Sequence, residues 1–71
     1  MFKQGDTVRI ADIEATKNDD LMHKEALKII EKSDFTGDIT KVEDGIYFVG
    51  FSNDLGWVTQ GFKEEEIQEV K

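Results

Sequence analysis

The alternation of apolar and polar residues predicts that most of this chain folds into short β-strands. Val8 and Ile10 alternate with polar residues directly after a Gly5-Asp6 turn, which is the two-residue period of a half-buried strand. The segment from Ile46 to Phe51 is dense in β-branched and aromatic residues and gives the strongest strand prediction. Further strands are expected over residues 38–43 and 56–60 and, at the end of the chain, over a short segment with Ile67 and Val70.

Irregular features are expected between and within these strands. Ile39 and Val42 lie three residues apart, a spacing that a flat strand cannot place on one face, so a bulge or sharp bend is predicted between them. Asp44-Gly45 is typical of a tight hairpin turn. The polar run over residues 63–66 predicts a single 3₁₀ turn before the last strand. Residues 11–17 show no sustained period.

An apolar stripe at helical spacing interrupts the strand pattern after the first strand. Met22, Ala26, Ile29 and Ile30 fall at positions i, i+4, i+7 and i+8, so they share one face of an amphipathic helix of about three turns. The cluster Asn18-Asp19-Asp20 offers N-cap side chains and acidic charge where the helix dipole favours it. The helix is therefore expected to begin at this cluster.

The register of the hairpin that follows residue 51 decides which side chains lie together. If Asn53-Asp54 forms the tip, the ladder pairs Val49 with Val58 and Gly50 with Trp57. Trp57 is then expected to lie across Gly50, where the missing side chain leaves room for the indole.

Length and charge narrow the class of protein. A chain of 71 residues has room for one hydrophobic core, so a single domain over residues 1–71 is predicted. The formal net charge is −7, and residues 33–71 hold three Lys or Arg against nine Asp or Glu. Such a surface repels phosphate backbones and anionic lipid, which argues against direct nucleic-acid binding and against a membrane partner.

No apolar run reaches the length of a membrane span or an export signal, so a cytoplasmic location is expected.

Several short motifs, in order, resemble those of SH3-like and KOW-type barrels. The segment from Phe2 to Ile10 resembles their opening strand, and Gly37-Asp38-Ile39 stands where they carry Gly-x-Ile or Gly-x-Val. The segment from Tyr47 to Phe51 resembles their Tyr-x-Val-x-Phe strand, and Glu65-Glu66-Ile67 with Val70 resembles their closing turn and strand. The resemblance implies a mainly β fold: a small five-stranded SH3-like barrel with one amphipathic helix inserted after the first strand. Length and order also resemble those of small proteins carried by Bacillus prophages, which implies a phage-derived protein.

No residue pattern points to catalysis, to a cofactor or to a metal. The chain has no cysteine and a single histidine, His23, so a thiolate nucleophile and the usual zinc ligand sets are absent. No phosphate-binding loop, dinucleotide fingerprint or nucleophile elbow occurs. Acidic runs such as 64–66 are typical of solvated turns rather than of a desolvated acid–base pair. We therefore expect a protein that is not an enzyme.

Two classes of function remain open, and both concern binding. The first is a protein-interaction module that docks a protein or peptide through a patch formed by Ile46, Phe48 and Trp57 and surrounded by an acidic rim. Within this patch, Phe48 is expected on the diagonal from Trp57 across the two strands. The alternative for these side chains is that the predicted helix covers and buries them. The second class is an acidic mimic of nucleic acid that inhibits a host DNA-binding protein. A nucleic-acid-binding barrel of the KOW type ranks third because of the charge.

Overall fold

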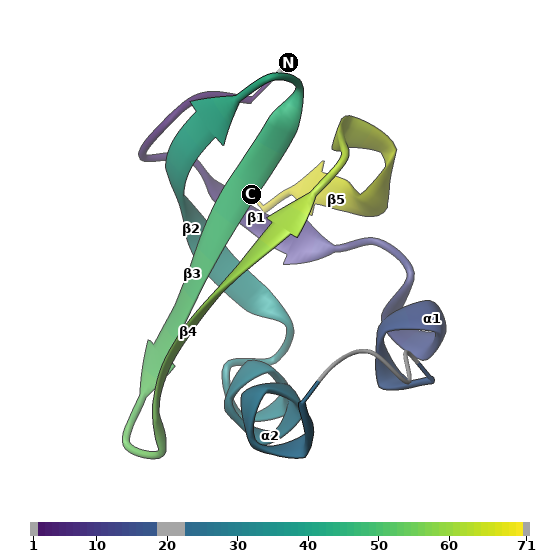
Figure 1. Cartoon of the computed structure of the whole chain (residues 1–71), viewed down its shortest axis with the longest axis vertical. Coiled ribbons are helices and arrows are strands. Elements are labelled where there is room, and N and C mark those ends of the chain that lie inside the picture. The colour runs from purple at the N-terminus through teal and green to yellow at the C-terminus, as the bar shows by residue number, and fades with distance from the viewer. Residues whose placement is uncertain (1, 19–22, 71) are drawn as a thin grey trace.

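The protein folds around one antiparallel sheet. The computed structural model describes residues 2–18 and 23–70. The strands lie in the order β4-β3-β2-β1-β5 (Figure 1), so the predicted mainly β fold with five strands is confirmed. The sheet is not closed into a barrel, because β4 and β5 remain its two edges. In chain order the elements are β1 (Thr7–Ile10), α1 (Ile13–Lys17), α2 (Lys24–Lys32), β2 (Thr36–Glu43), β3 (Ile46–Asn53), β4 (Gly56–Phe62), the 3₁₀ turn η1 (Glu64–Glu66) and β5 (Ile67–Glu69).

The core lies on the inward face of the curved sheet. Alternate residues of β1 and β3 point into it, as the two-residue period requires. From α2, Ile30 is fully buried among them. Burial of these apolar side chains is the main stabilising contribution in a chain this small. The buried apolar residues are Val8, Ile10, Ile30, Phe35, Ile39, Tyr47, Val49, Phe51, Phe62 and Ile67.

The predicted bulge in the second strand is confirmed. Ile39 pairs with Val49 and Lys41 with Phe48, so Thr40 is the extra residue on β2. Close to it, a Cβ at Gly37 would overlap the carbonyl oxygen of Gly50. The glycine and the bulge together let β2 bend closely over β3.

The turns beside β3 and β5 also agree with the sequence-based prediction. Asp44 and Gly45 both have positive φ, 51° and 78°, which fits the left-handed geometry of a two-residue hairpin turn. The polar run after β4 forms η1, where Glu66 Oε1 accepts a hydrogen bond from the Lys63 N–H at 2.7 Å. This contact positions the turn that leads into β5.

The helical region differs from the prediction. Residues 13–17 form α1, which was not expected, and Asp12 Oδ1 caps it by accepting a hydrogen bond from the Ala15 N–H at 3.0 Å. Asn18 is the C-cap of α1 instead of the start of the longer helix. That helix, α2, begins later, with His23 as its N-cap. Asp19, Asp20 and Met22 of the predicted helix start lie outside the described residues.

A compact turn returns the chain from α2 to the sheet. Asp34 and Phe35 both adopt a left-handed backbone with φ of 57°, a conformation that costs energy for residues other than glycine. The Phe35 side chain is buried, its N–H donates to Ile30 O at 3.0 Å, and its carbonyl accepts from the Ile10 N–H at 2.9 Å. Core burial and these bonds offset the cost.

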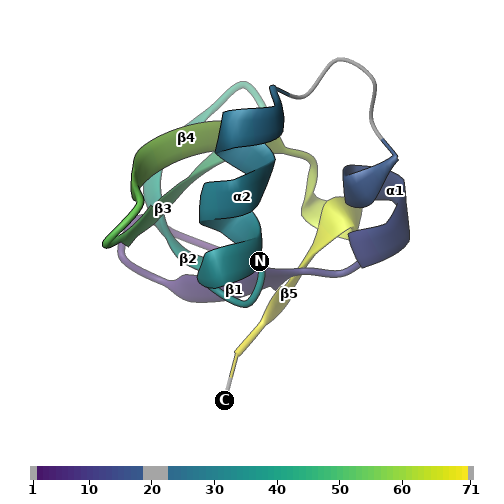
Figure 2. The same ribbon diagram turned by 90° about the horizontal axis from the view of Figure 1, so that it is seen from below.

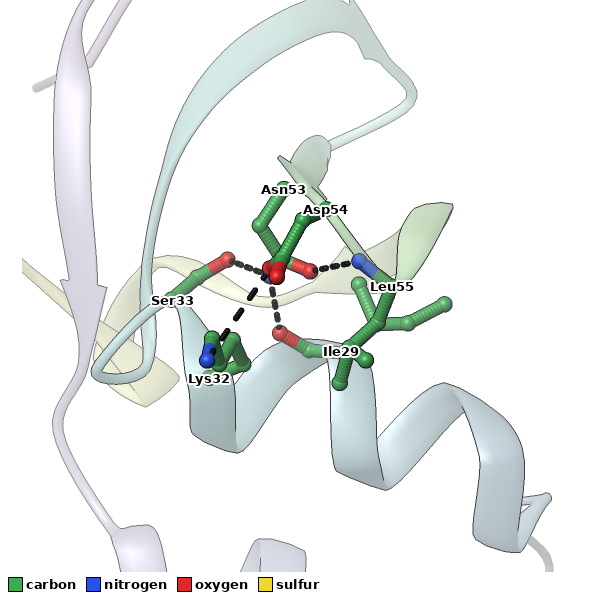
Figure 3. A network of polar contacts seen from close by, with 6 residues as sticks. All are labelled: Ile29, Lys32, Ser33, Asn53, Asp54 and Leu55. Atoms are coloured by element: carbon green, nitrogen blue, oxygen red, sulfur yellow. Dashed lines mark hydrogen bonds and ion pairs between the residues drawn. The ribbon is translucent and has the colours of Figure 1, made fainter.

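The helix α2 lies across one end of the curved sheet, with α1 to its side (Figure 2). Asn53, the last residue of β3, ties α2 to the β3–β4 hairpin (Figure 3). Its Nδ2 donates to Ile29 O at 2.8 Å and to Ser33 Oγ at 2.7 Å, and its Oδ1 accepts from the Leu55 N–H at 2.9 Å. One amide side chain thereby fixes the hairpin tip and the end of the helix together.

Candidate functional site

The outward face of the β3–β4 hairpin carries the three residues of the predicted patch. The assignment of faces is correct: Tyr47, Val49 and Phe51 are buried inward, while Ile46, Phe48 and Trp57 alternate to the other side. Because side chains alternate along a strand, an error of two residues in register leaves the faces unchanged.

The predicted register between β3 and β4 is wrong by two residues. The hairpin tip is Asp54-Leu55, because Asn53 pairs with Gly56. Trp57 therefore lies opposite Ser52, not Gly50. The Asn53 side chain explains the difference, because its bonds to α2 and to the Leu55 N–H hold Asn53 at the end of β3.

Phe48, rather than Trp57, is the aromatic residue that lies over a glycine. Phe48 pairs with Gly61, and a Cβ at Gly61 would lie 3.4 Å from Phe48 Cε1 and 2.9 Å from Ile46 Cγ2. Lys41, opposite Phe48 on β2, places its Nζ 6.0 Å from the ring centroid. Phe48 and Ile46 are half-buried by these neighbours, and they form one cluster.

Trp57 stands apart from that cluster. It lies four residues from Gly61 on β4, roughly 13 Å along a strand, so the predicted diagonal contact with Phe48 is absent. Its side chain is 76% exposed. Ser52 lies opposite it, and Gly50 and Thr59 follow in the next row of the same face. The small neighbours leave the indole open to solvent.

The helix does not cover this face. Ile30 of α2 enters the core, and Ile29 Cδ1 would lie 3.4 Å from a Cβ at Gly56. Both contacts are made on the inward side, because Ile29 and Ile30 pack with the core and Gly56 lies two residues before the inward-facing Val58. The apolar side of α2 is thus used for closing the core, and the helix leaves Trp57 uncovered.

A groove lies beside the end of the edge strand β4, and sequence reasoning did not anticipate it. It has a volume of about 480 Å³, within the range of roughly 300–1,000 Å³ common for ligand sites. The end of β4 forms one wall, and the opposite wall comes from the end of β1, from α1 and from η1. The lining residues are Ile10, Asp12, Ala15, Thr16, Gln60, Gly61, Phe62, Glu65 and Glu66. Only the three-dimensional fold brings these segments together.

The groove is acidic on the wall opposite β4. Asp12, Glu65 and Glu66 line it, and within residues 2–18 and 23–70 no Lys or Arg does. Asp12 and Glu66 each use one oxygen to accept a backbone hydrogen bond, which holds their carboxylates in place. Ile10 and Phe62 are buried beneath and give the groove an apolar floor.

Among residues 2–18 and 23–70, no three His, Asp or Glu side chains come close enough together to hold a metal ion. His23 is exposed at the start of α2, and its side chain makes no capping bond. Within the same residues, no helix has the length and apolar character needed to cross a membrane.

Comparison with known proteins adds no assignment. The chain matches no protein-family model, and no curated protein matches its sequence. The candidate site therefore rests on its own geometry: an exposed indole on the outward face of β4, and an acidic groove beside the end of the same strand.

Proposed function

We propose that this protein is a small, non-enzymatic, cytoplasmic interaction module of the SH3-like barrel type, derived from a phage, that binds a protein or peptide through outward aromatic residues of the β3–β4 hairpin. The observation that carries the proposal is Trp57, a large aromatic side chain that is 76% exposed on a strand. Tryptophan is the residue type most enriched among the anchors of protein interfaces.

The surroundings of Trp57 support this role. Asp54 lies in the turn before β4, and Glu43 and Asp44 lie beside Ile46 at the other end of the hairpin. Acidic side chains therefore lie at both ends of the hairpin. Glu43 pairs with Lys41, and Asp54 Oδ1 lies 4.0 Å from Lys32 Nζ, so the polar rim of the docking site carries both signs of charge. The strand order, with the helices inserted after β1 and η1 before β5, supports the SH3-like assignment, with a barrel that stays open between β4 and β5.

The two nucleic-acid alternatives receive less support. The described strands carry only Asp38, Glu43 and Glu69 as acidic residues, too few for the double row of charge that a nucleic-acid mimic needs. The cations on these strands, Arg9 and Lys41, each face a carboxylate, at 3.7 Å from Asp34 and 2.5 Å from Glu43. Few free cations are then left on the sheet to bind phosphate.

The test compares partner capture by three forms of the tagged chain in host cytoplasm: wild type, Trp57→Ala and Val42→Ala. Val42 is the matched control because it is an exposed apolar side chain on β2, which β3 separates from β4. We expect a protein that wild type and the control retain and Trp57→Ala loses. Titration of that purified partner should show an affinity loss of about 30-fold or more, as for an interface anchor worth about 2 kcal/mol. Equal binding by all three forms would contradict the proposal.

A further inference from the structure

The free edge of β4 suggests how a partner binds. One two-residue turn joins β2 to β3, and another joins β3 to β4. The two residues that flank such a turn form a hydrogen-bonded pair, so Ile46 is bonded to Glu43 and Gly56 is bonded to Asn53. Counting along β4 from Gly56, the peptide groups of Val58, Gln60 and Phe62 also face β3. Those of Trp57, Thr59 and Gly61 face the other way. Among the described residues, no hydrogen bond joins these three groups to another element.

The same edge opens into the acidic groove. Gly61 belongs to the groove lining, and Trp57 marks the opposite end of the free edge. A strand added here would have side chains that alternate, like those of β4, between the outward face and the groove. Outward side chains would lie beside Trp57 and Thr59. Inward ones would pass over Ile10 and Phe62 toward Asp12, Glu65 and Glu66.

The acidic residues of the groove favour a positively charged partner. Lysine and arginine side chains can lay their apolar stems over Ile10 and Phe62 and place their charge against the carboxylates. A second copy of this chain, with a net charge of −7, would bring like charge to an acidic wall and is disfavoured. The other sheet edge, β5, is only three residues long and offers a poor template.

We infer that the β4 edge binds an extended basic peptide segment as an added strand, with lysine or arginine side chains in the groove and apolar side chains beside Trp57. This mode is β-augmentation, in which main-chain hydrogen bonds give affinity and alternate side chains give specificity. The inference rests on the proposed function and specifies the partner of the same strand.

The test uses a blocked seven-residue peptide that alternates valine with lysine, added to the full ¹⁵N-labelled chain. Two control peptides carry glutamate in place of lysine, or N-methyl groups on alternate amides that would face β4. We expect the lysine peptide to slow hydrogen exchange at the amides of Trp57, Thr59 and Gly61, because these form the new bonds. Neither control peptide should do so. Fluorescence of Trp57, the chain's single tryptophan, follows the same titration.

A matched pair of variants tests the charge of the groove. Glu65→Gln should weaken binding of the lysine peptide about two- to five-fold, as loss of an exposed ion pair does. Glu31→Gln, an exposed change on α2, should leave it unchanged.

Three results would overturn the inference: protection by the glutamate or N-methyl peptide, shifts confined to other strands, or protection of the β4 edge that rises with protein concentration without peptide. The last result would identify a second copy as the occupant. If a captured partner depends on Trp57 while the β4 amides remain unprotected in its complex, the proposed function stands and this inference fails.

Discussion

Phe48 and Trp57 lie on one face of the β3–β4 hairpin, and their surroundings differ. Phe48 is half-buried over Gly61, whereas Trp57 is open to solvent. We expect Phe48→Ala to lower the free energy of unfolding by about 1–3 kcal/mol, because it removes packed aromatic surface. Trp57→Ala should lower it by less than about 1 kcal/mol.

Denaturant unfolding of both variants beside wild type measures this difference. The result also decides how the binding experiment is read, because a Trp57→Ala chain that keeps its stability can lose a partner only through the lost contact. An equal or larger loss for Trp57→Ala would mean that the indole is packed in solution.

Among the glycines of the described residues, Gly37 has the least space for a side chain, at the bend of β2. A Cβ there would meet backbone, the carbonyl oxygen of Gly50, which cannot rotate away. Gly37→Ala should therefore cost on the order of 1–3 kcal/mol or more, as overpacking does. Gly50→Ala is the comparison, because the nearest atom to its Cβ, at 3.0 Å, is the side-chain methyl of Thr40.

Thermal or denaturant melts of the two glycine variants should rank Gly37→Ala as clearly less stable than Gly50→Ala. The reverse order would show that β2 can move away from β3 without loss of the ladder.

At the scale of elements, Asn53 joins α2 to the β3–β4 hairpin. Asn53→Ala removes its three hydrogen bonds, to Ile29 O, Ser33 Oγ and the Leu55 N–H. A net value near 1 kcal/mol for each predicts a loss of about 1–3 kcal/mol of unfolding free energy. The variant should also loosen α2, which hydrogen exchange at the amides of Leu27 and Ser33 reports, since both are bonded within the helix.

Ser52→Ala is the matched control for Asn53→Ala, because Ser52 is the exposed neighbour on the same strand. It should leave both stability and α2 exchange close to wild type. Loss of stability without faster exchange in α2 would contradict the view that Asn53 couples the two elements.

At the scale of the whole molecule, the net charge of −7 is spread over a body of 29 × 24 × 22 Å. Charges at this separation repel one another at about 10 mM salt, where the screening length is about 30 Å, and much less at physiological ionic strength, where it is about 8 Å. Added NaCl should therefore raise the melting temperature over that range. A fall would show that attraction within pairs such as Arg9–Asp34 outweighs the repulsion.

The same charge predicts weak binding of double-stranded DNA. Few unpaired cations are available on the strands to release counterions, so a fluorescence anisotropy titration at about 150 mM salt should show a dissociation constant no tighter than the non-specific range of about 10⁻⁴ to 10⁻⁶ M. Sub-micromolar binding would make the nucleic-acid-binding barrel the better assignment.

Local patterns in the sequence determined the elements of this protein that depend on near neighbours. The two-residue alternation placed the strands and assigned Val49, Phe51 and Trp57 to the correct faces. The three-residue spacing of Ile39 and Val42 predicted the bulge, and Asp44-Gly45 predicted a turn that depends only on its own backbone. The short helix α1 was missed although Asp12, its N-cap, is a visible signal, because five residues are too few to show a helical period.

Tertiary structure decided the features that depend on contacts between distant segments. The hairpin register follows from Asn53, whose bonds reach α2 at Ile29, so the sequence of the hairpin alone leaves it open by two residues. The face covered by α2 follows from the burial of Ile30 in the core. The groove exists because the sheet stops short of closure, which leaves β4 facing α1 and η1 across a gap that no local pattern encodes.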